Sequence, residues 1–158
     1  GHQLGTSLDL GYLDADGNIG VKFPSYYYNL WAAAEKTPKD QVAINKLKKW
    51  VNVNRAYIQS IIKDQRGSSF DFSMPTSTKV KIIYLGKGDS DTPKPEDTPT
   101  IFSILTKGIL PAIASDTSLG TWNPYPWIKY DGKFIVQEMT PHDNHFHVEF
   151  EPSKQGDF

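Results

Sequence analysis

The segment near the C-terminal end, residues 142–150, constrains the fold of this chain most, because apolar and polar residues alternate along it. Successive side chains on a β-strand point to opposite faces of the sheet, so residues two apart share a face. The apolar face consists of Phe146, Val148 and Phe150. The opposite face carries His145, His147 and Glu149. We therefore predict a strand over residues 145–151, in which buried apolar side chains support two imidazoles and a carboxylate.

A second alternating segment lies near the N-terminal end, from Thr6 to Tyr12. Leu8 and Leu10 share one face of the predicted strand, and Asp9 lies on the other face. We expect the two leucines to be buried together with the apolar face of residues 145–151. The two strands should then be neighbours in one sheet.

Asp16-Gly17 is a strong signal for a hairpin turn, because both residues tolerate the backbone angles that such a turn requires. A further strand is expected after it, with Ile19, Val21 and Phe23 in alternation. Asp14, Asp16 and Asn18 also resemble part of a calcium loop. The bidentate glutamate of that motif is missing, so a plain turn is favoured.

The middle of the chain predicts helices and then a strand. One helix is expected over residues 27–35, and a second begins at Thr37-Pro38, with the threonine as its cap. Residues 56–62 are ambiguous and favour a strand followed by a short helical turn. Residues 79–85 predict a strand with Val80, Ile82 and Tyr84 on one face. The second helix has apolar residues at helical spacing, namely Val42, Ile44, Leu47, Trp50 and Val51.

The remaining segments complete an α+β pattern. Residues 101–113 predict a helix interrupted near Pro111, and residues 127–130 and 134–138 flank a hairpin signal at Asp131-Gly132. Residues 86–100 are rich in Pro, Asp, Ser and Thr and form either a mobile lid or a solvated surface loop. This order predicts one α+β domain over residues 1–158, with a mostly antiparallel central sheet flanked by helices.

Composition excludes several classes of site and partner. The chain has no cysteine, so neither a disulfide scaffold nor a thiolate metal site is available. A net charge of −1 argues against nucleic acid as a partner, and no apolar run is long enough for a membrane span. We expect no signal sequence within these residues. Because the chain begins abruptly at Gly1-His2, we expect a processed or trimmed N-terminus, with part of the N-terminal region missing.

Ligands for a metal are found at both ends of the chain. His2, Asp9 and His147 offer an imidazole, a carboxylate and a second imidazole. This set, with water as a fourth ligand, suits a tetrahedral catalytic zinc. One alternative to a metal site is a polar strand face without a metal, which would carry the same two histidines, His145 and His147. His2 alone would also fit an unstructured chain end.

The two motifs resemble those of a known enzyme group. Residues 2–9, His-Gln-Leu-Gly-Thr-Ser-Leu-Asp, have the His-x6-Asp spacing of the LAS metallopeptidases. That group includes D-Ala-D-Ala peptidases, murein endopeptidases and the hedgehog signalling domain. Residues 141–148, Pro-His-Asp-Asn-His-Phe-His-Val, resemble the C-terminal motif of the penicillin-insensitive murein endopeptidases. The resemblance implies a hedgehog/D-Ala-D-Ala-peptidase-like fold.

The resemblance also implies a role for each matching position. His2, Asp9 and His147 match the zinc ligands. His145 matches the histidine that acts on the reacting water or the transition state, and His142 matches a further active-site histidine. Asp143 is a candidate for orienting a histidine ring. The chain departs from the pattern at Glu149, where a basic residue is expected.

The function implied is zinc-dependent cleavage of peptide crosslinks in bacterial peptidoglycan, in the periplasm or outside the cell. One alternative is a module of the same fold that binds a metal without hydrolysis. Another is a D,D-carboxypeptidase or dipeptidase, although Asn144 stands where those enzymes carry a glutamate. Six aromatic residues either line a substrate groove or pack in the core, and packing is favoured for most of them. They are Tyr26, Tyr27, Tyr28, Trp122, Tyr125 and Trp127.

Overall fold

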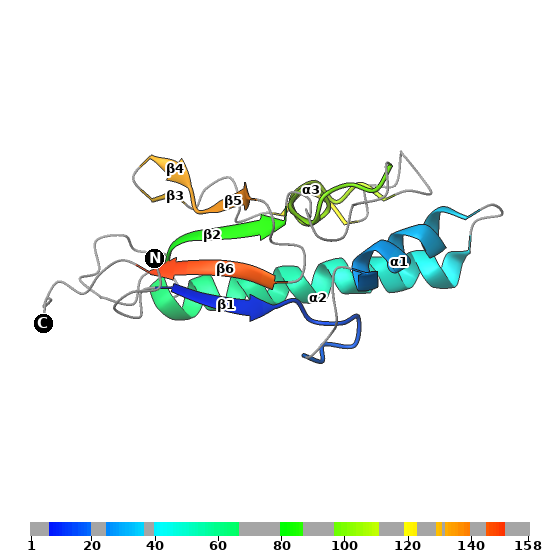
Figure 1. Ribbon diagram of the computed structural model, residues 1–158, viewed down its shortest axis with the longest axis horizontal. Coiled ribbons are helices and arrows are strands. Elements are labelled where there is room, and N and C mark those ends of the chain that lie inside the picture. Colours follow the sequence, from blue (N-terminus) through cyan, green and yellow to red (C-terminus); the bar gives the residue numbers. More distant parts are fainter. Residues whose placement is uncertain are drawn as a thin grey trace, which may run out of the picture.

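Four strands form one mixed sheet in the part of the chain that the structure, a computed structural model, describes (Figure 1). The described residues are 7–19, 25–36, 40–66, 80–86, 97–110, 119–122, 129–130, 132–139 and 145–150. The strand order is β1 (Ser7–Gly11), β6 (His145–Phe150), β2 (Val80–Gly86) and β5 (Val136–Met139). The β1–β6 and β6–β2 pairs are antiparallel, and the β2–β5 pair is parallel. The predicted α+β class and the predicted pairing of the two terminal strands are therefore confirmed.

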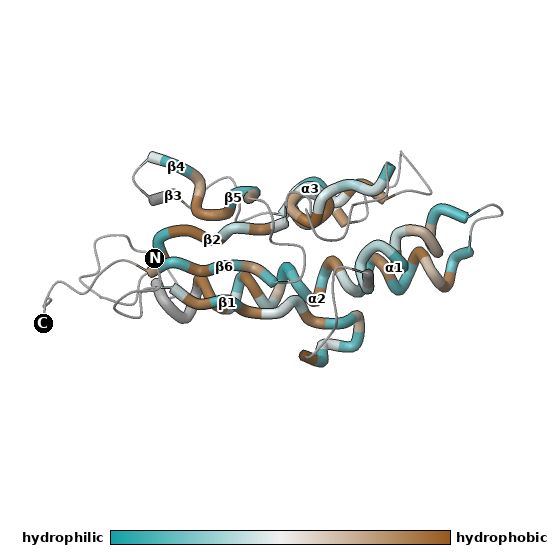
Figure 2. Tube along the Cα trace, viewed as in Figure 1, coloured by the Kyte–Doolittle hydropathy of each residue, from teal (hydrophilic) through white to brown (hydrophobic). Residues whose placement is uncertain are grey.

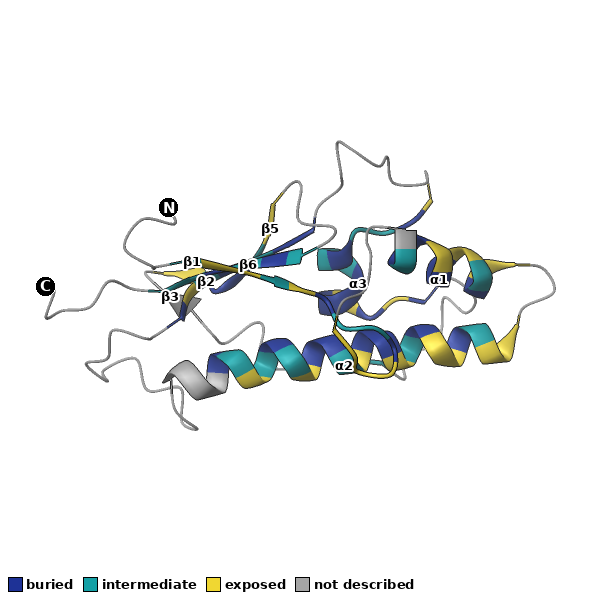
Figure 3. Ribbon diagram, turned by 60° about the horizontal axis from the view of Figure 1, so that its bottom comes forward, coloured by how far each residue is buried: buried dark blue, intermediate teal, exposed yellow. Residues whose placement is uncertain are grey.

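A long helix, α2 (Gln41–Arg66), packs against the sheet and against a shorter helix, α1 (Ser25–Glu35) (Figures 1 and 3). It begins after Asp40, whose carboxylate accepts a hydrogen bond from the Val42 backbone N–H at 2.9 Å and so caps the helix. Hydrophobic and hydrophilic residues alternate along α2 at helical spacing (Figure 2). Its buried apolar side chains are Ile44, Leu47, Trp50, Val51, Ile58 and Ile62.

Two predictions about α2 are wrong. Residues 56–62 continue the helix and contain no strand, because Ile58 and Ile62 extend the same buried stripe. Val42 belongs to the predicted apolar set, yet it is 78% exposed beside the start of the helix. The expected helix start at Thr37-Pro38 lies outside the described residues, whereas the helix predicted over residues 27–35 is confirmed as α1.

The core lies between the sheet and α2. Phe146 and Val148 on β6 are fully buried, and Tyr57 on α2 packs edge-on against Phe146 at 5.6 Å between ring centroids. Leu10 and Phe150 are partly buried against this core. Leu8 was expected to be buried with them and is 46% exposed, because it lies near the start of β1 at the edge of the sheet.

An irregularity in β2 changes which of its residues face the core. The pairing of β2 with β6 shifts register between Val80 and Ile82, as in a β-bulge. The alternation therefore changes phase: Ile83 and Leu85 are buried, while Ile82 and Tyr84 lie on the opposite face. The prediction that Val80, Ile82 and Tyr84 share one face is wrong for this reason.

The helix α3 (Ile101–Lys107) is shorter than predicted. Thr100 caps its start by accepting a hydrogen bond from the Ser103 N–H, and Gly108 ends it in the left-handed region at φ 70°. Gly108 is tightly surrounded, since a Cβ placed there would lie 2.3 Å from the Gly120 carbonyl oxygen. The helix expected over residues 101–113 is thus wrong for residues 108–110. Residues 111–113 lie outside the described residues.

Arg55 joins α2 to this corner of the fold. Its Nε donates a hydrogen bond to the Leu105 carbonyl at 2.7 Å, and its two terminal nitrogens donate to Leu119 and Gly120, each at 2.8 Å. The side chain is buried, and this burial lowers the pKa of Arg55 to about 10. One guanidinium thereby ties three backbone carbonyls to α2.

The chain turns at both predicted positions, and the second turn joins two paired strands. Asp14 accepts hydrogen bonds from the backbone N–H groups of Asn18 and Asp16, which lowers the pKa of Asp14, and Gly17 adopts φ 88°. Ile19, expected in a strand, is exposed outside any strand, and residues 20–24 lie outside the described residues. Gly132, at φ 78°, precedes β4 (Lys133–Phe134), which pairs with β3 (Lys129–Tyr130). Of the helices within the described ranges, none has the length and apolar character needed to cross a membrane.

Candidate functional site

A row of polar side chains crosses the face of the sheet opposite the core. Asp9 on β1 lies directly opposite His147 on β6, and Tyr84 on β2 lies opposite His147 on the other side. Gln137 on β5 continues the row beside Tyr84. Cross-strand neighbours on one face have Cβ atoms about 4.5–5.5 Å apart, so each side chain in the row can contact the next. The alternation that buries Phe146 thus places the polar residues together on the other face.

His147 is held by groups from three strands. Its Nδ1 lies 2.8 Å from Asp9 Oδ1, and its Nε2 lies 3.2 Å from Glu149 Oε2. The Tyr84 ring stacks on the imidazole, with 5.9 Å between centroids and 26° between planes. Only 12% of the His147 side chain is exposed. The ring is therefore fixed in orientation, as a metal ligand or a catalytic base requires.

The hydrogen-bonding capacity of His147 limits the chemistry of this arrangement. Ionised carboxylates only accept hydrogen bonds, and a neutral imidazole carries a single N–H. Both contacts are hydrogen bonds at the same time only if the ring is doubly protonated. If the single proton is on Nε2, it is donated to Glu149, and Nδ1 directs its lone pair toward Asp9. Nδ1 and Asp9 Oδ1 can then bind the same cation.

His145 lies on the same face and is more accessible. Its Nε2 is 4.0 Å from Asp9 Oδ1, and 31% of its side chain is exposed, against 12% for His147. Gly11 lies opposite His145 on β1, so no side chain from that position covers the ring. An accessible imidazole beside a carboxylate is suited to proton transfer with a bound molecule.

The structure brings together some of the predicted site residues. Asp9, His145 and His147 gather on one face, and His147 Nδ1 lies within hydrogen-bonding distance of Asp9 Oδ1, at 2.8 Å. His2, His142 and Asp143 lie outside the described residues, so the predicted ligand set cannot be completed there. Among the residues that are described, no group of three or more His, Asp or Glu side chains is arranged to hold a metal ion. The zinc site thus stays a prediction that needs His2.

Tyr84 was not predicted at this site. Its hydroxyl group is partly buried, and this burial, together with the Glu149 carboxylate, raises the pKa of Tyr84 above its ordinary value. The β-bulge brings Tyr84 to this face, and nothing in residues 79–85 indicates such a bulge. Glu149, in contrast, was expected on the face of His147, and the contact at 3.2 Å agrees with that expectation.

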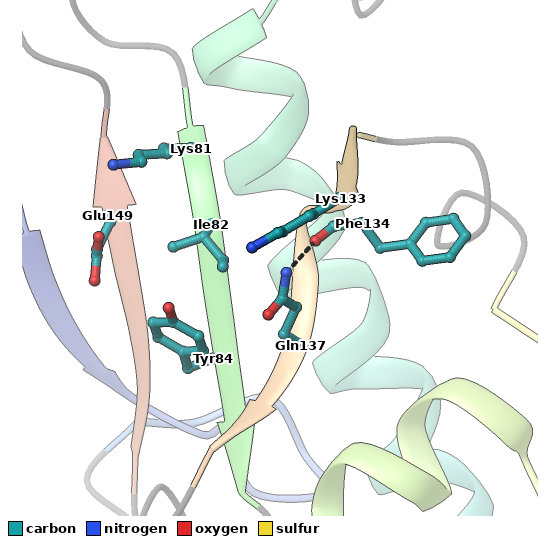
Figure 4. Close-up of a pocket in the computed structure, with 7 residues that line it drawn as sticks. All are labelled: Lys81, Ile82, Tyr84, Lys133, Phe134, Gln137 and Glu149. Atoms are coloured by element: carbon teal, nitrogen blue, oxygen red, sulfur yellow. Dashed lines mark hydrogen bonds between the residues drawn. The ribbon is translucent and has the colours of Figure 1, made fainter. Parts of the chain in front are cut away.

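A cavity of about 210 Å³ lies on the face of the sheet that carries Tyr84 and Glu149 (Figure 4). Tyr84 and Glu149 belong both to this cavity and to the surroundings of His147. The side chain of Gln137 is fixed in its wall, since its amide donates a hydrogen bond to the Phe134 carbonyl oxygen at 3.0 Å. The complete lining consists of Lys81, Ile82, Tyr84, Lys133, Phe134, Gln137 and Glu149.

The aromatic residues suggested for a groove belong mainly to the core. Tyr27, Tyr28 and Trp122 are buried, and Tyr27 stacks on Trp50 at 5.0 Å. The Tyr26 hydroxyl accepts a hydrogen bond from the Ala15 backbone N–H at 2.9 Å. Packing, the favoured alternative, is confirmed for the three buried residues. Tyr125 and Trp127 lie outside the described residues.

Comparison of this chain with models of protein families, with curated proteins and with solved structures finds no match in any of the three. The functional interpretation therefore rests on the motifs and on the geometry described above.

Proposed function

We propose that this chain is a zinc-dependent peptidase that cleaves peptide crosslinks of bacterial peptidoglycan, with a hedgehog/D-Ala-D-Ala-peptidase-like fold. One observation carries the proposal: the Asp9 carboxylate and the His147 imidazole, 138 residues apart in sequence, lie 2.8 Å apart on paired strands. The two motifs that resemble the LAS metallopeptidases contribute one residue each to this contact. A pair of strands that joins both motifs is what a shared metal site requires.

In this proposal His2, Asp9 and His147 hold the zinc ion. A zinc ion with three protein ligands lowers the pKa of a bound water toward ~7 and polarises a substrate carbonyl. The contact between His147 Nε2 and Glu149 supports Nδ1 as the ligand atom, because Nδ1 is the nitrogen that faces Asp9. Glu149 then acts as a positioning residue that fixes the tautomer and the orientation of the His147 ring.

His145 serves the reaction as a proton carrier in this proposal. It is near Asp9 without the close contact that His147 makes, and its ring is accessible from the open face of the sheet. A histidine can both accept and donate a proton near neutral pH. His145, assisted by His142, moves the proton between the reacting water and the leaving amine and stabilises the developing oxyanion. The substrate implies that the enzyme acts in the periplasm or outside the cell.

Digestion of purified peptidoglycan tests the proposal. The chain should convert crosslinked muropeptide dimers into monomers, detected by mass spectrometry, and chelation followed by zinc addition should abolish and then restore the conversion. Release of free D-alanine instead of monomers would indicate a carboxypeptidase. Tight zinc binding with an unchanged dimer fraction would indicate a non-hydrolytic module. An unchanged dimer fraction without zinc binding contradicts the proposal altogether.

A further inference from the structure

We propose that the cavity beside His147 is a substrate subsite that binds a free carboxylate of the peptide. This inference rests on the proposed function, in which the substrate is a peptide stem that carries free carboxylates. It goes further because it gives Lys81 and Lys133, which lie outside both motifs, the role of binding that carboxylate.

The first argument is charge. Two amines belong to one small cavity: Lys81 comes from β2, and Lys133 extends from β4 toward β2 (Figure 4). No ion pair between the described residues involves either lysine. The carboxylate in the lining, Glu149, contacts His147. The lining thus holds two amines that form no ion pair with a described residue, against one carboxylate that already contacts His147. This excess of positive charge favours an anionic ligand, and a carboxylate can accept hydrogen bonds from both amines at once.

The second argument is shape. Ile82, Tyr84 and Phe134 provide apolar and aromatic surface, and Gln137 is held in place by its hydrogen bond to Phe134. A cavity needs about 10–15 Å³ of volume to hold one water molecule. The volume of about 210 Å³ therefore accommodates a carboxylate together with the residue that carries it. The β-bulge is essential for this lining, because it allows the consecutive residues Lys81 and Ile82 to contribute to the same cavity.

The third argument is continuity with the proposed catalytic centre. Tyr84 stacks on His147 and lines the cavity, and Glu149 contacts His147 and lines the cavity as well. A ligand in the cavity is therefore separated from His147 by a single layer of side chains. A peptide whose carboxylate is held at the lysines can extend along the sheet face toward His145 and Asp9.

Calorimetric titration with two probes tests the subsite. The probes are an N-acetylated D-alanyl dipeptide with a free C-terminal carboxylate and the same dipeptide as its carboxamide. The protein is titrated after zinc removal, so that the carboxylate cannot bind a metal and the probe is not hydrolysed. We expect the carboxylate probe to bind about tenfold more tightly than the amide, as two exposed charge-assisted contacts allow. Equal affinity for the two probes would overturn the proposal.

Variants identify the groups responsible. The double substitution Lys81→Gln and Lys133→Gln should remove the preference for the carboxylate, and circular dichroism verifies that the variant is folded. Lys36→Gln is the matched control, because Lys36 is exposed and directly follows α1. The helix α1 and the strand β4 lie toward opposite ends of the molecule (Figure 1). A preference retained in the double variant contradicts the assignment of the lysines.

Turnover on peptidoglycan separates this inference from the proposed function. A carboxylate preference that depends on the two lysines, in a protein that cleaves no crosslinks, supports the subsite and contradicts the peptidase. Cleavage at an unchanged rate in the double variant, together with equal affinity of the wild type for the two probes, supports the peptidase and contradicts the subsite.

Discussion

Asp9 and His147 lie directly opposite each other on β1 and β6, with 2.8 Å between Asp9 Oδ1 and His147 Nδ1. The contact joins the two ends of the described chain across a pair of antiparallel strands. Its position depends on strand register, because a shift by one residue would turn His147 toward the core and Phe146 toward the solvent. The buried Phe146 and Val148 therefore hold the two polar side chains in contact.

Glu149 should control how firmly His147 binds zinc. Glu149→Leu removes the acceptor for Nε2 and so one of the contacts that orient the ring, and we expect zinc affinity to fall about 10–100-fold. Glu149→Gln retains an acceptor oxygen and should recover part of that loss. Competition with a chromophoric chelator measures both affinities. Equal affinity in the leucine variant and the wild type contradicts a positioning role for Glu149.

Tyr84 should ionise at a higher pH than an ordinary tyrosine, because burial and the Glu149 carboxylate both raise its pKa by opposing the anion. In the unfolded chain Tyr84 ionises near ~10. Its contribution to stability is therefore complete below that pH and is lost as pH rises through the higher folded value. The difference in tyrosinate absorbance between wild type and Tyr84→Phe isolates this group. Glu149→Gln should shift the midpoint of the difference curve to lower pH. A wild-type midpoint at or below the ordinary pKa of tyrosine would contradict this prediction.

Arg55 should be among the most important residues for stability. Arg55→Met leaves the carbonyls of Leu105, Leu119 and Gly120 without their donor, and we expect the free energy of unfolding to fall by about 3–5 kcal/mol. Arg55→Lys can replace part of the contacts and should lose less. Urea denaturation followed by circular dichroism provides the values. A loss below about 1 kcal/mol in the methionine variant would show that the three hydrogen bonds of Arg55 contribute little to stability.

Alanine substitutions at two glycines with positive φ can distinguish the cost of backbone strain from the cost of a steric clash. A Cβ at Gly17, where φ is 88°, would meet no other atom within 4 Å, whereas a Cβ at Gly108 would lie 2.3 Å from the Gly120 oxygen. Gly17→Ala should cost about 1–2 kcal/mol, the ordinary penalty for the left-handed region. Gly108→Ala should cost clearly more in the same urea experiment. Equal losses would mean that the corner around Gly120 can relax.

Strong alternation made the two terminal strands predictable from sequence. In both β1 and β6 the apolar residues recur with period two, and Asp9, His145 and His147 lie on the face that this period assigns to them. The pairing of the strands followed from the expectation that their apolar faces share one core. The position of Leu8 was less predictable, because its exposure depends on β1 being an edge strand.

Features that depend on tertiary contacts could not be predicted in this way. Residues 56–62 contain β-branched and aromatic residues that favour a strand locally, but packing against the sheet selects the helix. The bulge in β2, which brings Lys81 and Tyr84 to the site, has no marker in residues 79–85. Arg55 gave no signal either, since its partners lie at least 50 positions away in sequence.

Zinc content of two histidine variants tests the central claim most directly. His147→Ala removes a proposed ligand and should bind no zinc, whereas His145→Ala should retain a full equivalent, measured by elemental analysis. His145→Ala should lose about 10²–10⁴-fold in peptidoglycan turnover, as expected for removal of a general acid or base. Absence of zinc from the wild type, loss of zinc in His145→Ala, or full activity in that variant would contradict the account.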